Sequence, residues 1–403
     1  MLPLPDIADN PIPTIYLDNA ATSFPKPEAV YADVDAWTRR GGIAFGRGSH
    51  SAGNEAAQMV TVCRSRLAQL LNAESSDRIA FTFNCTDGLN LLLRGILRSG
   101  DRVITTDLEH NSVLRPLQQL QSELNLDVVR VGFDRATGIV NEAAINNELS
   151  KAATRLVVLN HASNVTGVIQ PAKSIAAAAQ SAGALCLFDA AQTIGHLPVD
   201  LQDIGADLMA TAGHKGLLGP LGTGLIYVRA GLDAELRPIR CGGTGTVSEL
   251  LSQPETMPSK LESGNMNMPG LAGLNAAVQW LLQHDIAVLH DQVTTRVLEL
   301  HQKLSAISGI TTYSNPAETS NAGIISFTIN GVDSHEAATI LDQSFGIQCR
   351  AGLHCAPLVH ETLGTLASGG TIRFSPGPFT TDEHIAATVQ AVQQIARAFS
   401  PAS

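Results

Sequence analysis

The sequence predicts an α/β fold in which a large domain with a mostly parallel, seven-stranded sheet precedes a smaller α+β domain. Three observations lead to this prediction. Short apolar, β-branched runs alternate with helical patterns between residues 79 and 229, as in parallel sheets covered by helices on both faces. The composition changes after Arg229, and 403 residues suffice for one large and one smaller domain.

Within the first region, seven runs have the length and composition of strands, and helix-like segments separate several of them. A glycine-rich loop joins the last two runs, which is compatible with an antiparallel last strand. Strand order does not follow from the pattern. The strand candidates are Ile79–Phe83, Arg102–Thr105, Asp127–Val131, Arg155–Asn160, Ala184–Asp189, Asp207–Thr211 and Gly224–Arg229, and the helix candidates are Asp87–Leu97, Ser112–Leu124, Asn141–Leu149 and Ala172–Gln180.

The second region begins with loops, since residues 231–270 are rich in Gly, Pro, Ser and Thr. Helices and short strands follow, so we expect a large domain over 15–275 and a small domain over 276–403. Residues 1–14 are expected to pack on the small domain. The elements expected here are helices Gly270–Gln283, Ile286–Ile307, Ser334–Phe345 and Thr381–Phe399, and strands Gly323–Ile329, Gly346–Arg350 and Gly370–Phe374.

Composition excludes several classes of protein. Apolar residues make up 44% and charged residues 16%, which indicates a globular chain. The net charge of -11 argues against a nucleic-acid partner. No apolar run is long enough to span a membrane, and the N-terminus lacks the pattern of a signal peptide, so we expect a cytoplasmic protein. Six scattered cysteines form no C-x-x-C pair, so neither a metal site nor a disulfide framework is expected.

Two residues at strand ends indicate cofactor chemistry. Lys215 follows a buried strand in "TAGHKGLLGP", where desolvation could prepare its amine for Schiff-base chemistry, although an isolated lysine is more often a surface residue. Asp189 ends the strand of "LCLFDAAQT"; it could cap a helix, or it could hold a proton on the pyridine nitrogen of pyridoxal phosphate (PLP). The two residues lie one βαβ step apart, and each supports the other.

Three further residues follow other predicted strands. Thr86 lies at the N-terminus of a predicted helix, whose free N–H groups and dipole favour a phosphate, although ordinary capping explains it equally well. His110 could stack on a planar cofactor, and Asn164 could bond a phenolic oxygen. Each signal is weak alone, but together they describe a single cofactor site.

The ordered motifs resemble the fold-type I PLP enzymes, and specifically the class-V aminotransferase and cysteine desulfurase family. The resemblance covers nearly the whole chain, and "RAGLHCAP" is similar to the loop of the group that includes selenocysteine lyases. The quoted motifs are "IYLDNAATSFPKPEAV", "RGSHSAG", "LEHNSV", "NHASNVTG", "FDAAQTIGHLPVD", "TAGHKGLLGP", "LESGNMNMPG", "RAGLHCAP" and "TIRFSPGPFTT".

The resemblance implies a role for each matching residue. Lys215 would bind PLP covalently and move the substrate Cα proton, Asp189 would pair with the pyridine nitrogen, and Cys355 would accept sulfur. His110 would stack on the ring and assist proton transfer. Asn164 and Gln192 would face the ring hydroxyl, Thr86 and His214 would hold the phosphate together with Gly264 and Asn265 of the second subunit of a homodimer, Arg373 would clamp the substrate carboxylate, and Ala20, His50, Asn164 and Arg350 would line the substrate pocket.

The implied activity is that of a PLP-dependent cysteine desulfurase, which converts L-cysteine to L-alanine and leaves a persulfide on Cys355 for an acceptor protein or thiol. His354 or Arg350 is expected to help lower the pKa of that thiol. Three alternatives remain open. They are a selenocysteine lyase or cysteine/cystine C–S lyase on the same fold, a class-V aminotransferase or epimerase, and a non-catalytic scaffold that retains the fold.

Several positions depart from the family pattern, and two others bear on the loop that carries Cys355. Ala212 stands where a serine is frequent, and Asn265 where a threonine is usual, so the phosphate site has fewer hydroxyl groups. Leu353 replaces the first of two histidines that usually precede the thiol. Cys349 is predicted to lie within a strand as an unreactive thiol, and Pro357 limits where a helix could start behind Cys355.

Overall fold

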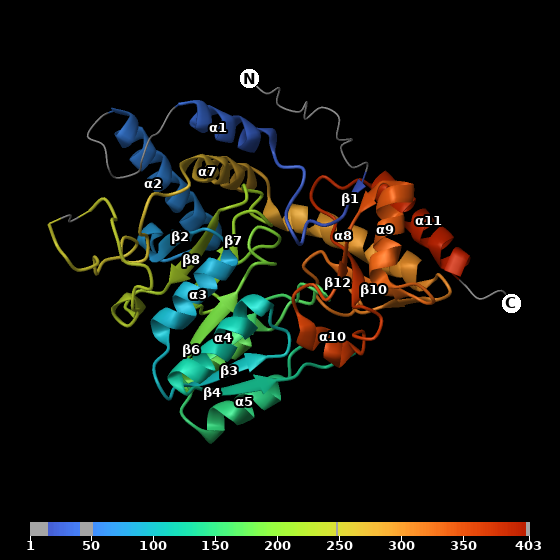
Figure 1. Ribbon diagram of the computed structural model, residues 1–403, viewed down its shortest axis with the longest axis horizontal. Coiled ribbons are helices and arrows are strands. Elements are labelled where there is room, and N and C mark those ends of the chain that lie inside the picture. Colours follow the sequence, from blue (N-terminus) through green and yellow to red (C-terminus); the bar gives the residue numbers. More distant parts are fainter. Residues whose placement is uncertain (1–14, 41–50, 247–248, 400–403) are drawn as a thin grey trace.

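The structure is a computed structural model that describes residues 15–40, 51–246 and 249–399. Its largest element is a seven-stranded sheet, with a second group of helices and short strands beside it in Figure 1. The strands of the large sheet run in the order β2 (Ile79–Thr82), β8 (Gly224–Val228), β7 (Leu208–Ala212), β6 (Leu185–Asp189), β5 (Leu156–Asn160), β3 (Arg102–Thr106) and β4 (Asp127–Val131).

The sheet confirms the predicted fold class. β7, β6, β5, β3 and β4 pair in parallel, and only β8 runs antiparallel to both of its neighbours. The inner strands β3, β5, β7 and β8 are buried along their whole length, and β6 is buried at all but its first residue, which explains their near-continuous apolar runs. β4 lies at one edge and exposes Asp127 and Arg130, charges that discourage pairing with another chain.

Alternate side chains of these strands enter two hydrophobic clusters, one on each face of the sheet. Val157 and Leu159 of β5 belong to the first cluster, whereas Leu156 and Val158 belong to the second, as the two-residue period of a strand requires. The first cluster is covered by α2 (Ser51–Leu71), α5 (Glu142–Lys151), α6 (Ala172–Ser181) and α7 (Met268–Gln283), and the second by α3 (Cys85–Ile96) and α4 (Asn111–Leu124).

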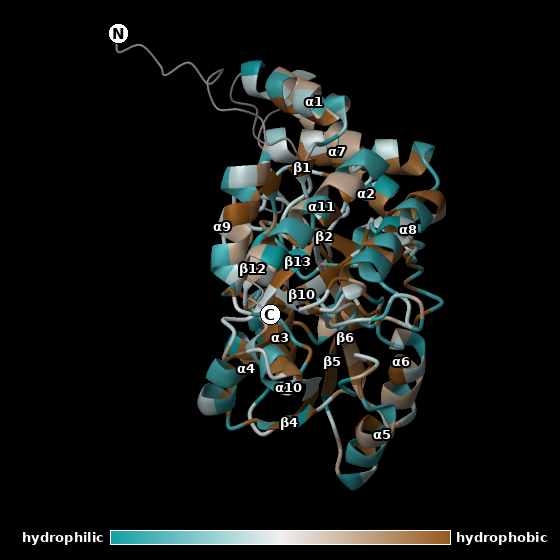
Figure 2. Ribbon diagram, turned by 90° about the vertical axis from the view of Figure 1, so that its right-hand side faces the viewer, coloured by the Kyte–Doolittle hydropathy of each residue, from teal (hydrophilic) through white to brown (hydrophobic). Residues whose placement is uncertain are grey.

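Hydrophobic residues accordingly gather in the central strands, while helices such as α4 and α5 carry hydrophilic residues outward (Figure 2). Side chains at the helix starts explain where these helices begin. Asn84 caps α3 by accepting from Asp87 N–H, and Asn267 caps α7 by accepting from Gly270 N–H. α3 therefore starts at Cys85, two residues before the predicted start.

The second region is built on a four-stranded antiparallel sheet in the order β12 (Arg350–Gly352), β13 (Thr371–Phe374), β10 (Ile325–Ile329) and β9 (Ile310–Thr312). The predicted strand over 346–350 is split, because β1 (Ile15–Tyr16) pairs with β11 (Ile347–Gln348) outside this sheet. The helices of this region are α8 (Ile286–Ser305), α9 (Ser334–Phe345), α10 (Pro357–Leu363) and α11 (Asp382–Phe399).

Several elements had no counterpart in the sequence prediction, namely the helices α1 (Glu28–Arg39), α2 and α10 and the short strands β1 and β9. α10 begins at Pro357, which occupies the first helical turn, where the fixed φ of proline suits a helix. None of the helices in the described ranges combines the length and apolarity needed to cross a membrane.

The hydrophobic clusters connect the two regions. Ile15 and Leu17 belong to the third cluster, which otherwise holds residues from α8 onward, whereas Ala356 and Val359 belong to the first cluster beneath the large sheet. Segments therefore cross in both directions over the expected boundary at residue 275, which stays a prediction. Residues 1–14 lie outside the described ranges. Cys355 consequently lies between a strand of one core and a helix of the other.

Candidate active site

A cavity of about 500 Å³ opens at the carboxyl ends of the parallel strands. Open α/β sheets bind ligands at this place, because the loops that follow neighbouring strands converge there. β5, β6 and β7 end at Asn160, Asp189 and Ala212, and all three residues line the cavity. The predicted site residues that line it are Thr86, His110, Asn164, Asp189, Gln192, His214 and Lys215.

Lys215 follows β7 and lies half-buried in this cavity. Burial lowers the pKa of its amine, Asp189 opposes this effect, and Arg373 adds to it. Desolvation penalises the ammonium form, so the neutral amine needed for nucleophilic attack or proton transfer becomes easier to reach. Lys215 therefore lies beside the sheet as predicted, and its lowered pKa suits Schiff-base chemistry.

Asp189 is only 4% exposed, and one of its two carboxylate oxygens is held by its surroundings. Oδ1 accepts from Ala191 N–H at 3.0 Å and from the Cys85 thiol at 3.4 Å. Burial and the nearby carboxylate raise the pKa of Cys85 well above its ordinary value, so this sulfur keeps its proton and acts as a donor. The sequence patterns assigned Cys85 no role; its place beside Thr86 was the available signal.

His110 lies at the start of α4 and belongs to a short polar network. Ser112 N–H donates to His110 Nδ1 at 3.0 Å, so the neutral ring carries its proton on Nε2. Burial lowers the pKa of His110 to about 4, with Asp189 opposing this shift, so the ring is neutral near pH 7. The Ser112 hydroxyl lies 2.8 Å from His110 Nδ1 and 2.7 Å from Thr86 Oγ1. Ser112 thus joins two predicted residues, and sequence reasoning missed it.

Three buried polar atoms on the cavity wall have no hydrogen-bond partner among the described residues: Asn164 Oδ1, Gln192 Oε1 and His214 Nδ1. Such atoms are uncommon in folded proteins and call for a ligand. Burial lowers the pKa of His214 to about 4, so its free Nδ1 belongs to a neutral ring. A planar group with polar substituents, a phosphate and a pyridine nitrogen matches these atoms together with Asp189, and the site therefore fits PLP.

Gly264 and Asn265 do not line this cavity. They lie in a separate recess of about 410 Å³, whose wall also includes Phe83 and Arg240. The sequence resemblance assigned these two residues to the cavity of a second subunit, and this assignment stays a prediction.

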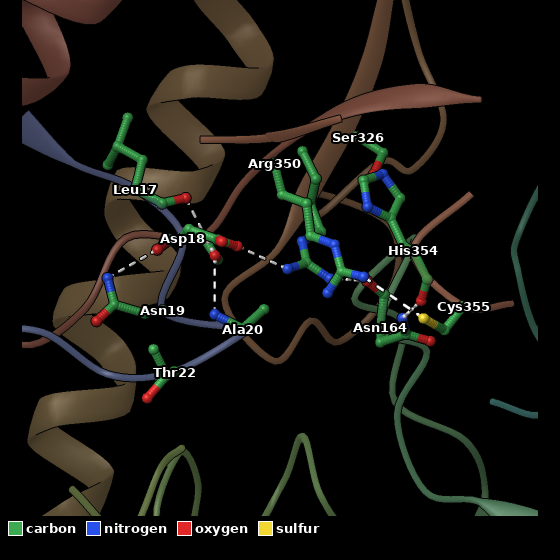
Figure 3. Close-up of polar contacts among 12 residues, drawn as sticks. Leu17, Asp18, Asn19, Ala20, Thr22, Asn164, Ser326, Arg350, His354 and Cys355 are labelled. Carbon is green, nitrogen blue, oxygen red and sulfur yellow. Dashed lines mark hydrogen bonds and ion pairs between the residues drawn. The ribbon is translucent and has the colours of Figure 1, made fainter. Parts of the chain in front are cut away.

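Arg373 and Arg350 face each other across the antiparallel pair of β13 and β12. Arg373 is 1% exposed; its Nη2 donates to Asp18 Oδ1 at 2.8 Å, and its Nη1 donates to the Asn164 carbonyl oxygen at 3.0 Å. Figure 3 shows Asp18 on one side of Arg350 and Asn164 on the other. Asp18 compensates the buried charge of Arg373, a contact that sequence reasoning did not anticipate.

Cys355 is half-buried in the turn between β12 and α10. Its sulfur lies 3.5 Å from Arg350 Nη2 (Figure 3). His354 is directed elsewhere, because its Nε2 lies 3.0 Å from the Thr371 hydroxyl and 3.1 Å from the Thr371 carbonyl. Burial keeps the pKa of His354 well below its ordinary value, so this ring is neutral. Of the two groups expected to act on the thiol, Arg350 is therefore the one in contact with it.

The remaining predicted residues can be placed briefly. Ala20 is buried beside the cavity, since its carbonyl accepts from Gln192 Nε2 at 3.0 Å and its N–H donates to Ser375 Oγ at 2.9 Å. His50 lies outside the described residues. Leu353, which replaces a histidine of the family pattern, is 38% exposed. Leu353 itself belongs to the turn that carries Cys355, since it directly follows β12.

Known proteins share both the sequence and the fold. The family model described as aminotransferase class-V matches residues 15–387. A curated relative from Methanothermobacter thermautotrophicus, named a probable cysteine desulfurase, is 37% identical over 386 residues, which cover 95% of this chain and 94% of the relative. A cysteine desulfurase from Yersinia pestis is 34% identical over 351 residues, which cover 85% and 84% of the two chains.

Solved structures agree with these relatives. The apo structure of a cysteine desulfurase from Thermococcus onnurineus superposes with a TM-score of 0.88 at 28% identity and covers 95% of each chain. A cysteine desulfurase from Escherichia coli in an S-sulfonic acid form superposes with a TM-score of 0.85 at 28% identity, over 96% of this chain and 95% of that one. Sequence and structure together show that the chain belongs to the class-V aminotransferase and cysteine desulfurase family.

Proposed function

We propose that this protein is a PLP-dependent cysteine desulfurase that transfers the sulfur of L-cysteine to Cys355. The observation that carries the proposal is the connection between the two halves of the site. Asn164 lines the cavity that holds Lys215, and its side-chain amide also donates to the His354 carbonyl, directly before Cys355. Asn164 thus links the cavity of Lys215, the proposed proton-transfer amine, to the turn of Cys355, the proposed sulfur acceptor. Cysteine desulfurases among the relatives lead us to expect such a link.

The cavity provides a partner for each part of PLP. Lys215 would bind the cofactor covalently, Asp189 would pair with the pyridine nitrogen, and His110 would lie against the ring. Asn164 and Gln192 would meet the ring hydroxyl, and Thr86 and His214 the phosphate. When bound, PLP supplies an electron-accepting ring that stabilises negative charge on the substrate Cα.

The residues of the chain then divide the reaction between them. Arg373 binds the substrate carboxylate through its planar guanidinium, and Lys215 in its neutral form takes the proton from Cα. The Cys355 thiolate forms a bond with the substrate sulfur while the Cβ–S bond breaks. The electron pair of that bond remains with the carbon skeleton, which becomes alanine after protonation. The products are alanine and a Cys355 persulfide, which accounts for every sulfur atom.

Two further features belong to this proposal. The enzyme works as a homodimer in which Gly264 and Asn265 complete the phosphate site of the partner subunit. Their recess has Phe83 on its wall, a phenyl group that is 49% exposed in the single chain. A sulfur-acceptor protein or thiol then receives the outer sulfur of the persulfide. Cys355 is accessible to such an acceptor because it is half-buried and lies close to the exposed Leu353. Sedimentation analysis tests the dimer, and a monomeric holoenzyme would contradict it.

The decisive experiment treats the PLP-loaded enzyme with L-cysteine and measures alanine, sulfide and the mass of the peptide that contains Cys355. We expect equal amounts of alanine and transferred sulfur, and one added sulfur atom on that peptide. Lys215→Ala should lose both the visible absorption of the bound cofactor and the turnover. Sulfide release with an unmodified Cys355 peptide would indicate a C–S or selenocysteine lyase, and a keto acid or racemised product an aminotransferase or epimerase.

A further inference from the structure

The turn that carries Cys355 has an unusual backbone. Gly352, His354 and Cys355 have φ values of +104°, +48° and +59°, so two consecutive non-glycine residues are left-handed. Side chains disfavour this region, and such residues persist where the surrounding structure holds them. One hydrogen bond, from Ala356 N–H to the Leu353 carbonyl at 2.9 Å, closes the turn from within. Other contacts must therefore hold the turn in this form.

Two hydrogen bonds from the large sheet region hold the carbonyl groups of the left-handed pair. Asn111 N–H donates to the Cys355 carbonyl at 2.7 Å, and Asn164 Nδ2 donates to the His354 carbonyl at 2.6 Å. Arg350 contacts the sulfur itself. Figure 3 shows the side chain of Asn164 reaching the segment of His354 and Cys355. Both the backbone and the side chain of Cys355 are thus constrained from outside the turn.

The donor at Asn111 is available because of its place in the chain. Asn111 is the first residue of α4, and the first N–H groups of a helix have no partner within the helix. The same helix start holds the ring of His110, since Ser112 N–H donates to His110 Nδ1. One rigid helical turn therefore sets the position of a ring on the cavity wall and of the carbonyl of Cys355.

We infer that the main-chain amide of Asn111 is a positioning group for Cys355, which fixes the left-handed turn so that the thiol meets the substrate sulfur. This inference rests on the proposed desulfurase function. The amide does not contact the reacting atoms; it acts through the backbone of Cys355. Sulfur transfer needs the two sulfur atoms aligned, and a misplacement of about 1 Å can reduce a rate on the order of a hundredfold.

A single substitution removes this hydrogen bond with little disturbance of the helix. Asn111→Pro deletes the N–H group at the first position of α4, where proline is favoured. His110 has φ -72° and ψ 155°, which suits a residue that precedes proline. Asn111→Ala is the matched control, because it shortens the side chain and keeps the N–H group.

Both variants are measured as PLP-loaded enzymes with L-cysteine. For Asn111→Pro we expect kcat to fall by about tenfold or more, with KM within about twofold, because misplacement affects the transfer step while Arg373 still binds the carboxylate. Amide exchange of the peptide over residues 353–358 should become faster. Asn111→Ala should behave as the wild type in both measurements. Equal kcat and equal exchange in the two variants would overturn the inference.

Exchange in the wild type provides a test that does not depend on the folding of a variant. The Asn111 amide should be protected, because the Cys355 carbonyl accepts from it; exchange at the rate of an unstructured peptide would refute the positioning role. The two proposals can fail separately. A wild type that produces no alanine from cysteine contradicts the desulfurase function, whereas the exchange results still decide whether Asn111 holds the turn.

Discussion

Two thiols beside the same active site have opposite surroundings. Cys85 begins α3 at the floor of the cavity, is buried, and donates to the Asp189 carboxylate. Cys355 lies on a left-handed turn, is half-buried, and contacts the guanidinium of Arg350. A thiol next to an anion keeps its proton, whereas reactive cysteines are found next to cations in partly exposed places. The same side chain is therefore a hydrogen-bond donor in one place and a candidate nucleophile in the other.

The backbone strengthens the contrast. Cys85 occupies a regular helical position that Asn84 caps, and its neighbours in sequence determine its conformation. The turn of Cys355 requires contacts from β12, Asn164 and Asn111 to remain left-handed. Each left-handed non-glycine residue costs about 1–2 kcal/mol, so the turn persists only while those contacts exist. Cys85 is thus placed by regular structure, and Cys355 by a turn that is held from outside.

Removing the nucleophile should have the largest effect. Cys355→Ser is expected to lower sulfur release from L-cysteine by about 10³-fold or more, since a hydroxyl cannot form a persulfide. The control is Cys349→Ser, because burial raises the pKa of Cys349 to about 12 and the residue lies outside the cavity. Alanine and sulfide production are measured for both. Full turnover in Cys355→Ser would show that Cys355 is not the nucleophile.

The contact with Arg350 should account for the reactivity of Cys355. In Arg350→Gln we expect alkylation of Cys355 by iodoacetamide at pH 7 to slow by roughly tenfold, because no cation then stabilises negative charge on the sulfur. Arg350→Lys retains the charge and should lose less. Mass spectrometry of the alkylated peptides gives the rates, with Cys241, an exposed thiol, as the internal reference. Unchanged rates would show that the contact has no chemical role.

His161 is a buried histidine that is neutral near pH 7, and such a residue predicts that the protein loses stability in acid. Burial lowers the pKa of His161 from 6.5 to about 4. As the pH falls below 6.5, the unfolded chain takes up this proton before the folded chain does, so the free energy of unfolding decreases. Between pH 7.5 and 5.5 we expect a loss of about 1 kcal/mol from this residue.

Urea denaturation at several pH values measures that loss. His161→Asn removes the titrating group, so its free energy of unfolding should depend less on pH over the same interval. The Thr193 hydroxyl, 3.0 Å from His161 Nδ1, retains a polar partner in this variant. An identical pH dependence in wild type and variant would contradict the assignment.

The smallest effect concerns the donor at Cys85. In Cys85→Ala, Asp189 Oδ1 loses one of its two donors, and we expect PLP affinity to fall by about two- to tenfold, the effect of one hydrogen bond. Cys85→Ser keeps a donor and should stay within about twofold of the wild type. Titration of the apo proteins with PLP, followed by absorbance, gives both dissociation constants. A serine variant as weak as the alanine variant would assign the effect to packing instead.

Much of the cavity could be predicted because its residues stand at strand ends. Asp189 ends β6 and Lys215 follows β7 closely, and apolar runs reveal such strands without knowledge of their partners. Ser112, Cys85 and Asp18 were missed, since each acts through one hydrogen bond whose partner is known only after folding. The direction of His354 was missed for the same reason, because its partner Thr371 lies on the neighbouring strand.

The sequence by itself determined the α/β class, the positions of the strands of the large sheet within a few residues, and the lysine and carboxylate that line the cavity. These follow from local patterns, because the period of burial and the residue types at strand ends can be read within short windows. Only the tertiary structure decided which groups hold the reactive ones. Asp18 and Arg373 are 355 residues apart in the chain, and Asn164 and His354 are 190 apart. Contacts of that range form only when the sheets and clusters assemble, so no local pattern specifies them.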